Sequence, residues 1–303
     1  MTSPDAPLVI GLGELLWDVF PDSQRPSGAP SNVAFQASQL GLNGLVASRV
    51  GEDPLGDELL EFLDSKGLDT SLIQRDAEYE TGRVTVDISD SGHPDYVIHE
   101  NTAWDHLEPT SELLDAAGRA AAVCFGTLAQ RSPQSRETIH QVLNTCSDEC
   151  LIVYDVNLRQ HWYDREWIER SLELSTIAKL NLDEAAVLCR LLDLDIKSIH
   201  RFASGIREQF EIELVCITRA ERGCWLSDIN ETVDLSGEPV DVVDAVGAGD
   251  AFSAALIATR LWGWPLQQSA EFANAIGGLV ASHSGAMPDL ADQFAELKAS
   301  YTV

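Results

Sequence analysis

The chain has 303 residues, of which 45% are hydrophobic and 23% charged, so it can bury a full core and is too apolar for disorder. Its 49 acidic and 20 basic side chains give a formal charge of −29, which would repel the backbone of a nucleic acid. No apolar run reaches the ~18 residues of a membrane-spanning helix, and the N-terminus lacks a basic segment followed by an apolar one. We therefore expect a cytoplasmic protein that binds neither nucleic acid nor membrane.

Apolar strand-like runs alternate with amphipathic helix-like runs along most of the chain. In chain order they are a strand over 8–10, a helix over 33–40, a strand over 45–50, a helix over 55–63, a strand over 121–125, a helix over 135–143, a strand over 151–156, a helix over 167–174, a strand over 177–180, a helix over 184–192 and a strand over 214–217. This order favours an α/β fold with a mainly parallel sheet and helices on both faces, a three-layer α/β/α sandwich.

Two segments, residues 14–20 and 81–99, break the alternation because they have extended patterns in which apolar and polar residues alternate. We expect them to form antiparallel strands outside the main sheet. Ligands of open α/β sheets bind beyond the carboxyl ends of the strands, so a small β layer there could act as a lid. The predicted division is a core of residues 1–13, 33–80 and 106–303 and a lid of residues 14–32 and 81–105. Exposed edges of the lid sheet could pair two subunits into a homodimer.

A glycine pair follows the first strand and suggests a dinucleotide-binding loop. Gly11 and Gly13 match the first two glycines of that motif, but Leu16 stands where the third is required. An NAD-linked oxidoreductase is therefore disfavoured, and a bound nucleotide would need another phosphate-binding loop.

The heptapeptide at residues 244–250, Asp-Ala-Val-Gly-Ala-Gly-Asp, runs directly into an apolar stretch of good helix formers. Gly247 and Gly249 relieve the Cβ clash that would keep successive N–H groups from turning toward one point, and Ala248 is nearly as small. With the positive end of the following helix, these N–H groups can hold an anion such as a phosphate. Asp250, in the first turn, could accept a proton from a hydroxyl as a phosphoryl group arrives.

The same heptapeptide has a structural interpretation. A strand-turn-helix junction also uses glycine for the bend and aspartate for the cap, and short motifs match often by chance. The heptapeptide alone leaves both interpretations open.

The heptapeptide resembles the signature of the ribokinase-like (phosphofructokinase-B) family of sugar kinases, and further segments match that family in order across essentially the whole chain. The matching segments are 13–18 (Gly-Glu-Leu-Leu-Trp-Asp), 28–34 (Gly-Ala-Pro-Ser-Asn-Val-Ala), 49–56 (Arg-Val-Gly-Glu-Asp-Pro-Leu-Gly), 155–159 (Asp-Val-Asn-Leu-Arg), 179–184 (Lys-Leu-Asn-Leu-Asp-Glu) and 218–223 (Thr-Arg-Ala-Glu-Arg-Gly). They are most similar to fructokinases. The resemblance implies a ribokinase-like fold with a small antiparallel β lid, and ATP and Mg²⁺ as cofactors. It favours the functional interpretation of the heptapeptide.

The resemblance also implies which residues hold the sugar: Asp18, Gly28, Asn32, His99, Asn157 and Arg159. A carboxylate such as Asp18 accepts hydrogen bonds from two vicinal hydroxyls, whereas the amide of Asn32 both donates and accepts. Each has a plain alternative: Asp18 could be a solvated strand residue, and Asn32 could cap the helix expected at 33–40, or do both. His99 stands where many fructokinases carry Arg, which leaves the particular sugar open.

On the nucleotide side, the resemblance implies roles for Asn181, Thr218, Gly223 and Asn274, with Asn274 beside the adenine. Glu184 and Asn181 would orient water around Mg²⁺, which keeps several waters while it contacts phosphates. The structural alternative is a capping box at a helix start, and both interpretations can hold together. The small residues around Asn274 equally suit tight helix packing.

A monovalent cation such as K⁺ is implied near Asp244, Val246 and residues 282–285. Two residues depart from the family pattern. Ala245 replaces a Thr and Ala220 replaces a Gly, which puts hydroxyl and close-backbone contacts there in question.

The sequence therefore predicts an ATP-dependent kinase that phosphorylates a small sugar, with fructose as the expected substrate. Asp250 would act as the base, and the N–H groups of Gly247, Ala248 and Gly249 would stabilise the moving γ-phosphoryl group. A ribose, nucleoside or 2-keto-3-deoxygluconate kinase and a non-catalytic sugar- or nucleotide-binding regulator are the alternatives. The intact Asp250 argues against a regulator.

Overall fold

The core of the protein is a large sheet in a computed structural model that describes residues 6–88, 94–194 and 198–301. In spatial order its described strands are β13 (Thr232–Leu235), β12 (Cys224–Ser227), β11 (Leu214–Thr218), β10 (Ile177–Asn181), β9 (Leu151–Asp155), β8 (Ala122–Phe125), β1 (Leu8–Leu12), β4 (Asn43–Gly51) and β5 (Ile73–Asp76). The strands from β11 to β5 pair in parallel, and β12 and β13 add an antiparallel edge.

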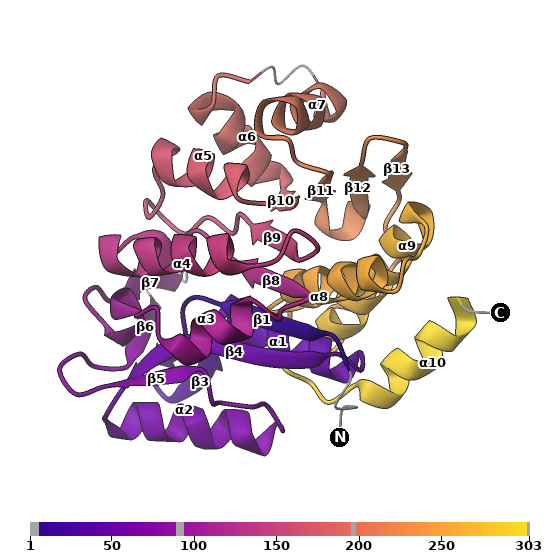
Figure 1. Cartoon of the computed structure of the whole chain (residues 1–303). Helices are drawn as coiled ribbons and strands as arrows, with labels where there is room; N and C mark the ends of the chain where they lie inside the picture. Colours follow the sequence, from indigo (N-terminus) through magenta and orange to yellow (C-terminus); the bar gives the residue numbers. More distant parts are fainter. Residues whose placement is uncertain (1–5, 89–93, 195–197, 302–303) are drawn as a thin grey trace.

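Helices cover both faces of this sheet (Figure 1). They are α1 (Ala29–Gln39), α2 (Pro54–Ser65), α3 (Ser111–Ala117), α4 (Pro133–Thr145), α5 (Arg165–Glu173), α6 (Leu182–Leu191), α7 (Ile199–Phe210), α8 (Ala248–Leu261), α9 (Leu266–Ala281) and α10 (Ala291–Tyr301). Successive strand side chains alternate between two apolar layers: Ile10 packs with α3 to α7, whereas Val9 packs with α1, α8, α9 and α10. The three-layer α/β/α sandwich expected from the sequence is confirmed.

A second, four-stranded sheet lies beyond the carboxyl end of β1. Its order is β3 (Ser23–Ser27), β2 (Leu16–Phe20), β6 (Gly82–Ile88) and β7 (Pro94–Ile98). The two hairpins β2–β3 and β6–β7 are antiparallel, as expected, and β2 pairs with β6 in parallel because both strands leave the core in the same direction. We call this sheet the lid. Of the residues that we assigned to it, 89–93 lie outside the described part of the chain.

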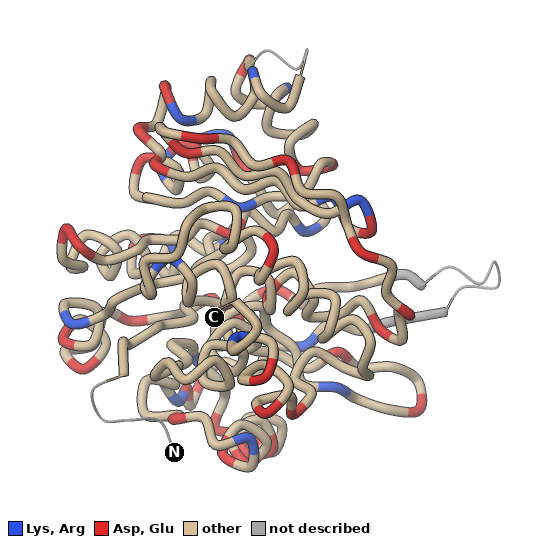
Figure 2. The backbone as a smooth tube through the Cα atoms, turned by 90° about the vertical axis from the view of Figure 1, so that its right-hand side faces the viewer, with Lys and Arg blue, Asp and Glu red and all other residues tan. Residues whose placement is uncertain are grey.

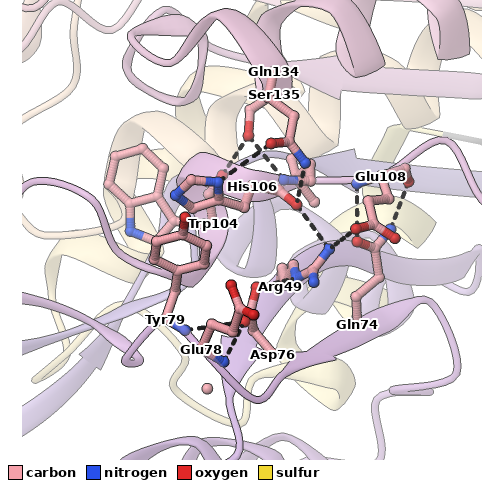
Figure 3. Close-up of polar contacts among 12 residues, drawn as sticks. Arg49, Gln74, Asp76, Glu78, Tyr79, Trp104, His106, Glu108, Gln134 and Ser135 are labelled. Atoms are coloured by element: carbon pink, nitrogen blue, oxygen red, sulfur yellow. Dashed lines mark hydrogen bonds and ion pairs between the residues drawn. The ribbon is translucent and has the colours of Figure 1, made fainter.

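The two connections between the core and the second half of the lid meet in a polar cluster at the end of β4 (Figure 3). Arg49 lies 2.7 Å from Asp76 Oδ2 and donates to the carbonyl of His106 at 2.8 Å. Asp76 accepts the N–H of Tyr79, whose ring stacks on His106 with centroids 3.5 Å apart. Arg49 is also paired with Glu108 at 2.9 Å. We call these five residues the hinge cluster, because they fix the points where the chain enters and leaves the second half of the lid.

The backbone carries far more acidic than basic positions, and the acidic ones are spread over the loops and helices seen in Figure 2. Among the described helices, none combines the length and the apolar character needed to cross a bilayer.

Candidate active site

The predicted phosphate cradle forms the start of α8. Gly247 is the N-cap residue, with φ +80°, and a Cβ atom there would lie 2.6 Å from the Cα of Ala286. Only glycine fits this position. The first N–H groups of a helix have no acceptors inside the helix, so they are free to bind an anion. Here the N–H of Ala248 donates to Ala245 O at 3.3 Å, a long hydrogen bond that closes the turn.

Asp250 lies in the first turn of α8 and is partly buried. Asn32 Nδ2 donates to its Oδ2 at 2.7 Å. Burial raises the pKa of Asp250 above its ordinary value, and the negative charge of Asp155 raises it further, whereas the Asn32 hydrogen bond and the cations Lys179 and Arg159 oppose this shift. A carboxylate of raised pKa that is held by a hydrogen bond suits a general base.

Asn32 does not cap a helix, contrary to one of the interpretations above. Helix α1 begins at Ala29, with Gly28 as its N-cap residue and Pro30 in the first turn, so Asn32 lies inside the helix. Proline is favoured in the first turn because it needs no N–H acceptor, and this moves the helix start upstream. The buried side chain of Asn32 therefore faces Asp250, and its Oδ1 has no hydrogen-bond partner among the described residues.

Two of the expected sugar residues, Asp18 and Gly28, lie on or beside the first hairpin of the lid. Asp18, on β2, is opposite Arg25 of β3. Burial raises the pKa of Asp18, while the Ser27 hydroxyl and the charges of Arg159 and Arg25 oppose the shift. Gly28 adopts φ +140°, and a Cβ there would lie 2.5 Å from the carbonyl oxygen of Glu14.

His99, at the return of the lid, is partly buried and hydrogen-bonded within the protein. Its Nε2 lies 2.7 Å from Thr85 Oγ1, and its carbonyl accepts a hydrogen bond from Arg131 at 2.6 Å. Burial lowers the pKa of His99, and the charge of Arg83 adds to that effect. The ring is therefore a neutral hydrogen-bonding group at neutral pH.

The segment after β9 brings further expected residues to the site. Asn157 adopts φ +40°, a left-handed conformation that asparagine tolerates. Arg159 is exposed, yet its charge acts on Glu14, Asp18 and Asp250. The next residue, Gln160, donates its side-chain N–H to the carbonyl of Tyr96 on β7 and so ties the lid to the core.

Asn181 and Glu184 form the predicted capping box at the start of α6. Asn181 Oδ1 accepts the N–H of Glu184 at 2.9 Å, and Glu184 Oε2 accepts the N–H of Asn181 at 2.8 Å. Glu184 Oε1 also accepts the N–H of Leu158 at 3.0 Å. Each carboxylate oxygen keeps a second lone pair, so Glu184 fits an Mg²⁺ ion that it contacts through water.

The other expected nucleotide residues lie on α9 and at the ends of β11 and β12. Asn274 borders a groove of about 450 Å³ between α9, α10 and the loop before α8, together with Glu238, Pro239, Val240, Ala275, Gly278, Leu279, Ser282, Gln293, Glu296 and Leu297. Thr218 is the last residue of β11, and Gly223, with φ +83°, directly precedes β12. Ala220 also has a positive φ of 52°, so the family's glycine position keeps its left-handed backbone here.

The residues expected around a monovalent cation do come together. Asp244 accepts the N–H of Val246 at 3.1 Å through Oδ1 and the N–H of Gly285 at 3.2 Å through Oδ2. The same Oδ2 lies 3.4 Å from Arg25 of the lid. Ala245 is exposed beside this loop, and nothing in the structure explains why it replaces a Thr.

Sequence reasoning assigned no role to several residues near the cradle. Glu14 is buried, and burial raises its pKa to about 7. Lys179 and Asp155 form a buried ion pair that Ser253 joins. A signal existed, because a Lys inside the apolar strand 177–181 must be buried and needs a partner.

A helix N-terminus with a glycine cradle, a recessed carboxylate beside it and a β layer over the ends of a parallel sheet define a class of α/β phosphotransferases. The chain belongs to the pfkB family of carbohydrate kinases, whose sequence pattern matches residues 12–293. It is thus a sugar kinase of that family.

Relatives of known name agree with this class. The chain is 30% identical over 298 residues to a sugar kinase of Pyrococcus horikoshii, covering 92% of this chain and 91% of the relative. The crystal structure of that uncharacterized kinase superposes with a TM-score of 0.84 at 28% identity over 98% and 99% of the two chains, and its complex with ATP with a TM-score of 0.80 at 28% identity over 92% and 94%. A fructokinase of Vibrio alginolyticus is 28% identical over 300 residues, 93% of this chain and 95% of the relative. The structure of a 2-dehydro-3-deoxygluconokinase from Thermotoga maritima has the same fold, with a TM-score of 0.80 at 20% identity over 96% and 97%.

Proposed function

We propose that this sugar kinase transfers the γ-phosphoryl group of ATP to a hydroxyl of fructose. The observation that carries the proposal is the 2.7 Å hydrogen bond from Asn32 to Asp250, which holds a base at the junction of lid and cradle. ATP is supported by the nucleotide complex of the Pyrococcus kinase, and fructose by the similarity to the Vibrio fructokinase.

The chain's own residues divide the reaction between them. Asp250 takes the proton of the attacking sugar hydroxyl, whose oxygen bonds to the γ-phosphorus as the bond to the bridging oxygen of ADP breaks. The N–H groups of Gly247, Ala248 and Gly249 stabilise the charge on the moving phosphoryl group. Asp18, Gly28, Asn32 and the lid hold the sugar and exclude water.

The remaining site residues hold the nucleotide and its metal. Mg²⁺, when bound, neutralises the triphosphate, and Glu184 with Asn181 would orient its waters. The groove at Asn274 takes the adenine, and Thr218 and Gly223, at the ends of β11 and β12, hold another part of the nucleotide.

An acidic sugar is the second candidate substrate. Arg25 and Arg159 both bring positive charge to Asp18, at the sugar end of the site. Guanidinium groups bind carboxylates well, which favours 2-keto-3-deoxygluconate over a neutral sugar if both cations face the ligand.

The test is an ADP-release assay with ATP, Mg²⁺ and a panel of fructose, ribose, a nucleoside and 2-keto-3-deoxygluconate. We expect the highest kcat/KM with fructose. Asp250→Asn is the control, because loss of turnover in this variant shows that the activity comes from this protein and not from a contaminant. A preference for 2-keto-3-deoxygluconate would replace fructose by the acidic sugar. No turnover with any sugar would favour a regulator.

Three further expectations stay predictions: a K⁺ requirement through Asp244 and Val246, a homodimer through the lid and a cytoplasmic location. Asp244 has a cationic partner in Arg25, which could take the place of K⁺. The K⁺ requirement is tested by comparing turnover in K⁺ and in tetramethylammonium salts.

A further inference from the structure

A buried ion pair lies beneath the cradle. Lys179 Nζ, on β10, lies 2.8 and 3.1 Å from the two carboxylate oxygens of Asp155 on β9. The two side chains are only 9% and 6% exposed, and the pairing of β9 with β10 sets them side by side. Burying such a pair costs desolvation that its own attraction often fails to offset. Stabilisation of the folded state is therefore a weak explanation for the presence of this ion pair.

The pair is joined to the cradle at both ends. A Cβ atom at Gly249 would lie 3.2 Å from Lys179 Nζ, so the ammonium group lies directly against the second residue of α8. Ser253 Oγ, one turn further on, lies 2.9 Å from Asp155 Oδ2 and 3.0 Å from the Gly249 carbonyl. The contacts close a ring that runs from Lys179 through Asp155 and Ser253 to Gly249.

The ammonium group keeps its charge in this position. Burial lowers the pKa of Lys179, because it disfavours the charged form. The carboxylates of Asp155, Glu184 and Asp250 have the larger combined effect and raise that pKa above its ordinary value. A charge fixed in a low-dielectric site acts more strongly than one in water and needs no reorganisation during the reaction.

We propose that Lys179, held by Asp155, is a positioning residue for phosphoryl transfer: its fixed positive charge beneath Gly249 strengthens the cradle's attraction for the phosphates. The inference rests on the proposed function and deepens it. The same charge favours the ionised form of Asp250, and the ring of contacts keeps the first turn of α8 in one conformation.

The decisive variant removes both charges at once. Lys179→Met with Asp155→Asn keeps the buried volume close to the original, so we expect it to regain the thermal stability that either single change loses. If the charge acts on the phosphates, kcat falls about tenfold or more and Mg-ATP affinity falls about fivefold, while the KM for the sugar stays within about twofold. The matched control is Arg131→Met with Asp105→Asn, a pair that is 4% and 5% exposed and joins the core to the residue at which the lid ends. This control should leave Mg-ATP affinity unchanged.

The single variants supply a signature that a structural role lacks. Asp250 is influenced by Asp155, Lys179 and Arg159, and it acts in turn on the buried Glu14. Lys179→Met should move the acid limb of the kcat/KM pH profile to higher pH, whereas Asp155→Asn should move it to lower pH.

The inference is overturned if the double variant, at wild-type thermal stability, keeps both kcat and Mg-ATP affinity within about twofold. Mg-ATP affinity is measured by calorimetry without sugar. If the wild-type protein phosphorylates no sugar of the panel, the proposed function fails, and the calorimetric result still decides the role of Lys179.

Discussion

The cradle and the lid are held by different kinds of contact. Around the cradle, buried and partly buried groups fix each other: Asn32 holds Asp250, and the pair of Lys179 and Asp155 lies against Gly249. The base of the lid is fixed by the hinge cluster, but its strand β7 touches the segment after β9 through an exposed group, the side chain of Gln160. A preorganised phosphate site lowers the barrier to transfer, whereas a lid that is fixed at its base and held by an exposed contact beyond it can adjust to its sugar. This difference explains why the residues specify the reaction more sharply than the substrate.

The largest effect should come from Asp250→Asn. Loss of the base should lower kcat by about 10³-fold with little change in the affinity for ATP. The exposed Glu61→Gln on α2 is the control. Turnover of Asp250→Asn within tenfold of the wild type would remove Asp250 from the role of base.

The same variant should be more stable at high pH. Because the pKa of Asp250 is raised in the folded state, the folded protein binds this proton more tightly than the unfolded chain, and stability is lost as pH rises through that range. Asp250→Asn removes this loss. We expect its Tm to exceed that of the wild type at pH 8 and to match it at pH 4 in thermal melts.

The cradle backbone is tested by Gly247→Ala. Alanine at φ +80°, with its Cβ 2.6 Å from the Ala286 Cα, should cost about 2–4 kcal/mol in urea unfolding. Gly263→Ala is the matched control, since Gly263 has φ +72° and nothing within 4 Å of a Cβ. It should cost only about 1 kcal/mol. Equal losses in the two variants would show that the close contact with Ala286 carries no energy.

On the lid side, Gln160→Ala removes one neutral hydrogen bond between the lid and the core. It should raise the KM for the sugar about threefold to tenfold, as expected from the free energy of one such bond, and leave kcat within twofold. The exposed Gln141→Ala on α4 is the control. A fall in kcat without a change in KM would mean that the lid contact belongs to the chemical step, and the comparison of cradle and lid would fail.

The smallest effect concerns Ala220. A left-handed conformation such as its φ of 52° costs an L-residue about 1–2 kcal/mol. Glycine avoids this strain, but it loses more chain entropy on folding, which cancels part of the gain. Ala220→Gly should therefore stabilise the protein by about 0.5 kcal/mol in urea unfolding. Ala77→Gly, at a residue without a positive φ, should destabilise it. A loss of stability in Ala220→Gly would show that the loop is unstrained.

The order of strands and helices was readable from the sequence because apolar periodicity follows directly from which faces are buried. The short edge strands β5, β12 and β13 and the helices α3, α7 and α10 were not predicted. The start of α1 was also misplaced, because the first turn Ala29-Pro30-Ser31 carries no clear apolar pattern.

The sequence by itself determined the cradle, because the backbone conformation of residues 244–250 depends on small residues that are neighbours in the chain. It also determined the capping box of Asn181 and Glu184 for the same local reason. Only the tertiary structure decided which distant groups meet. Asn32 and Asp250 are 218 residues apart, and their contact depends on how α1 and α8 pack on one face of the sheet. The same packing places Lys179 beneath Gly249, a contact that no local pattern encodes.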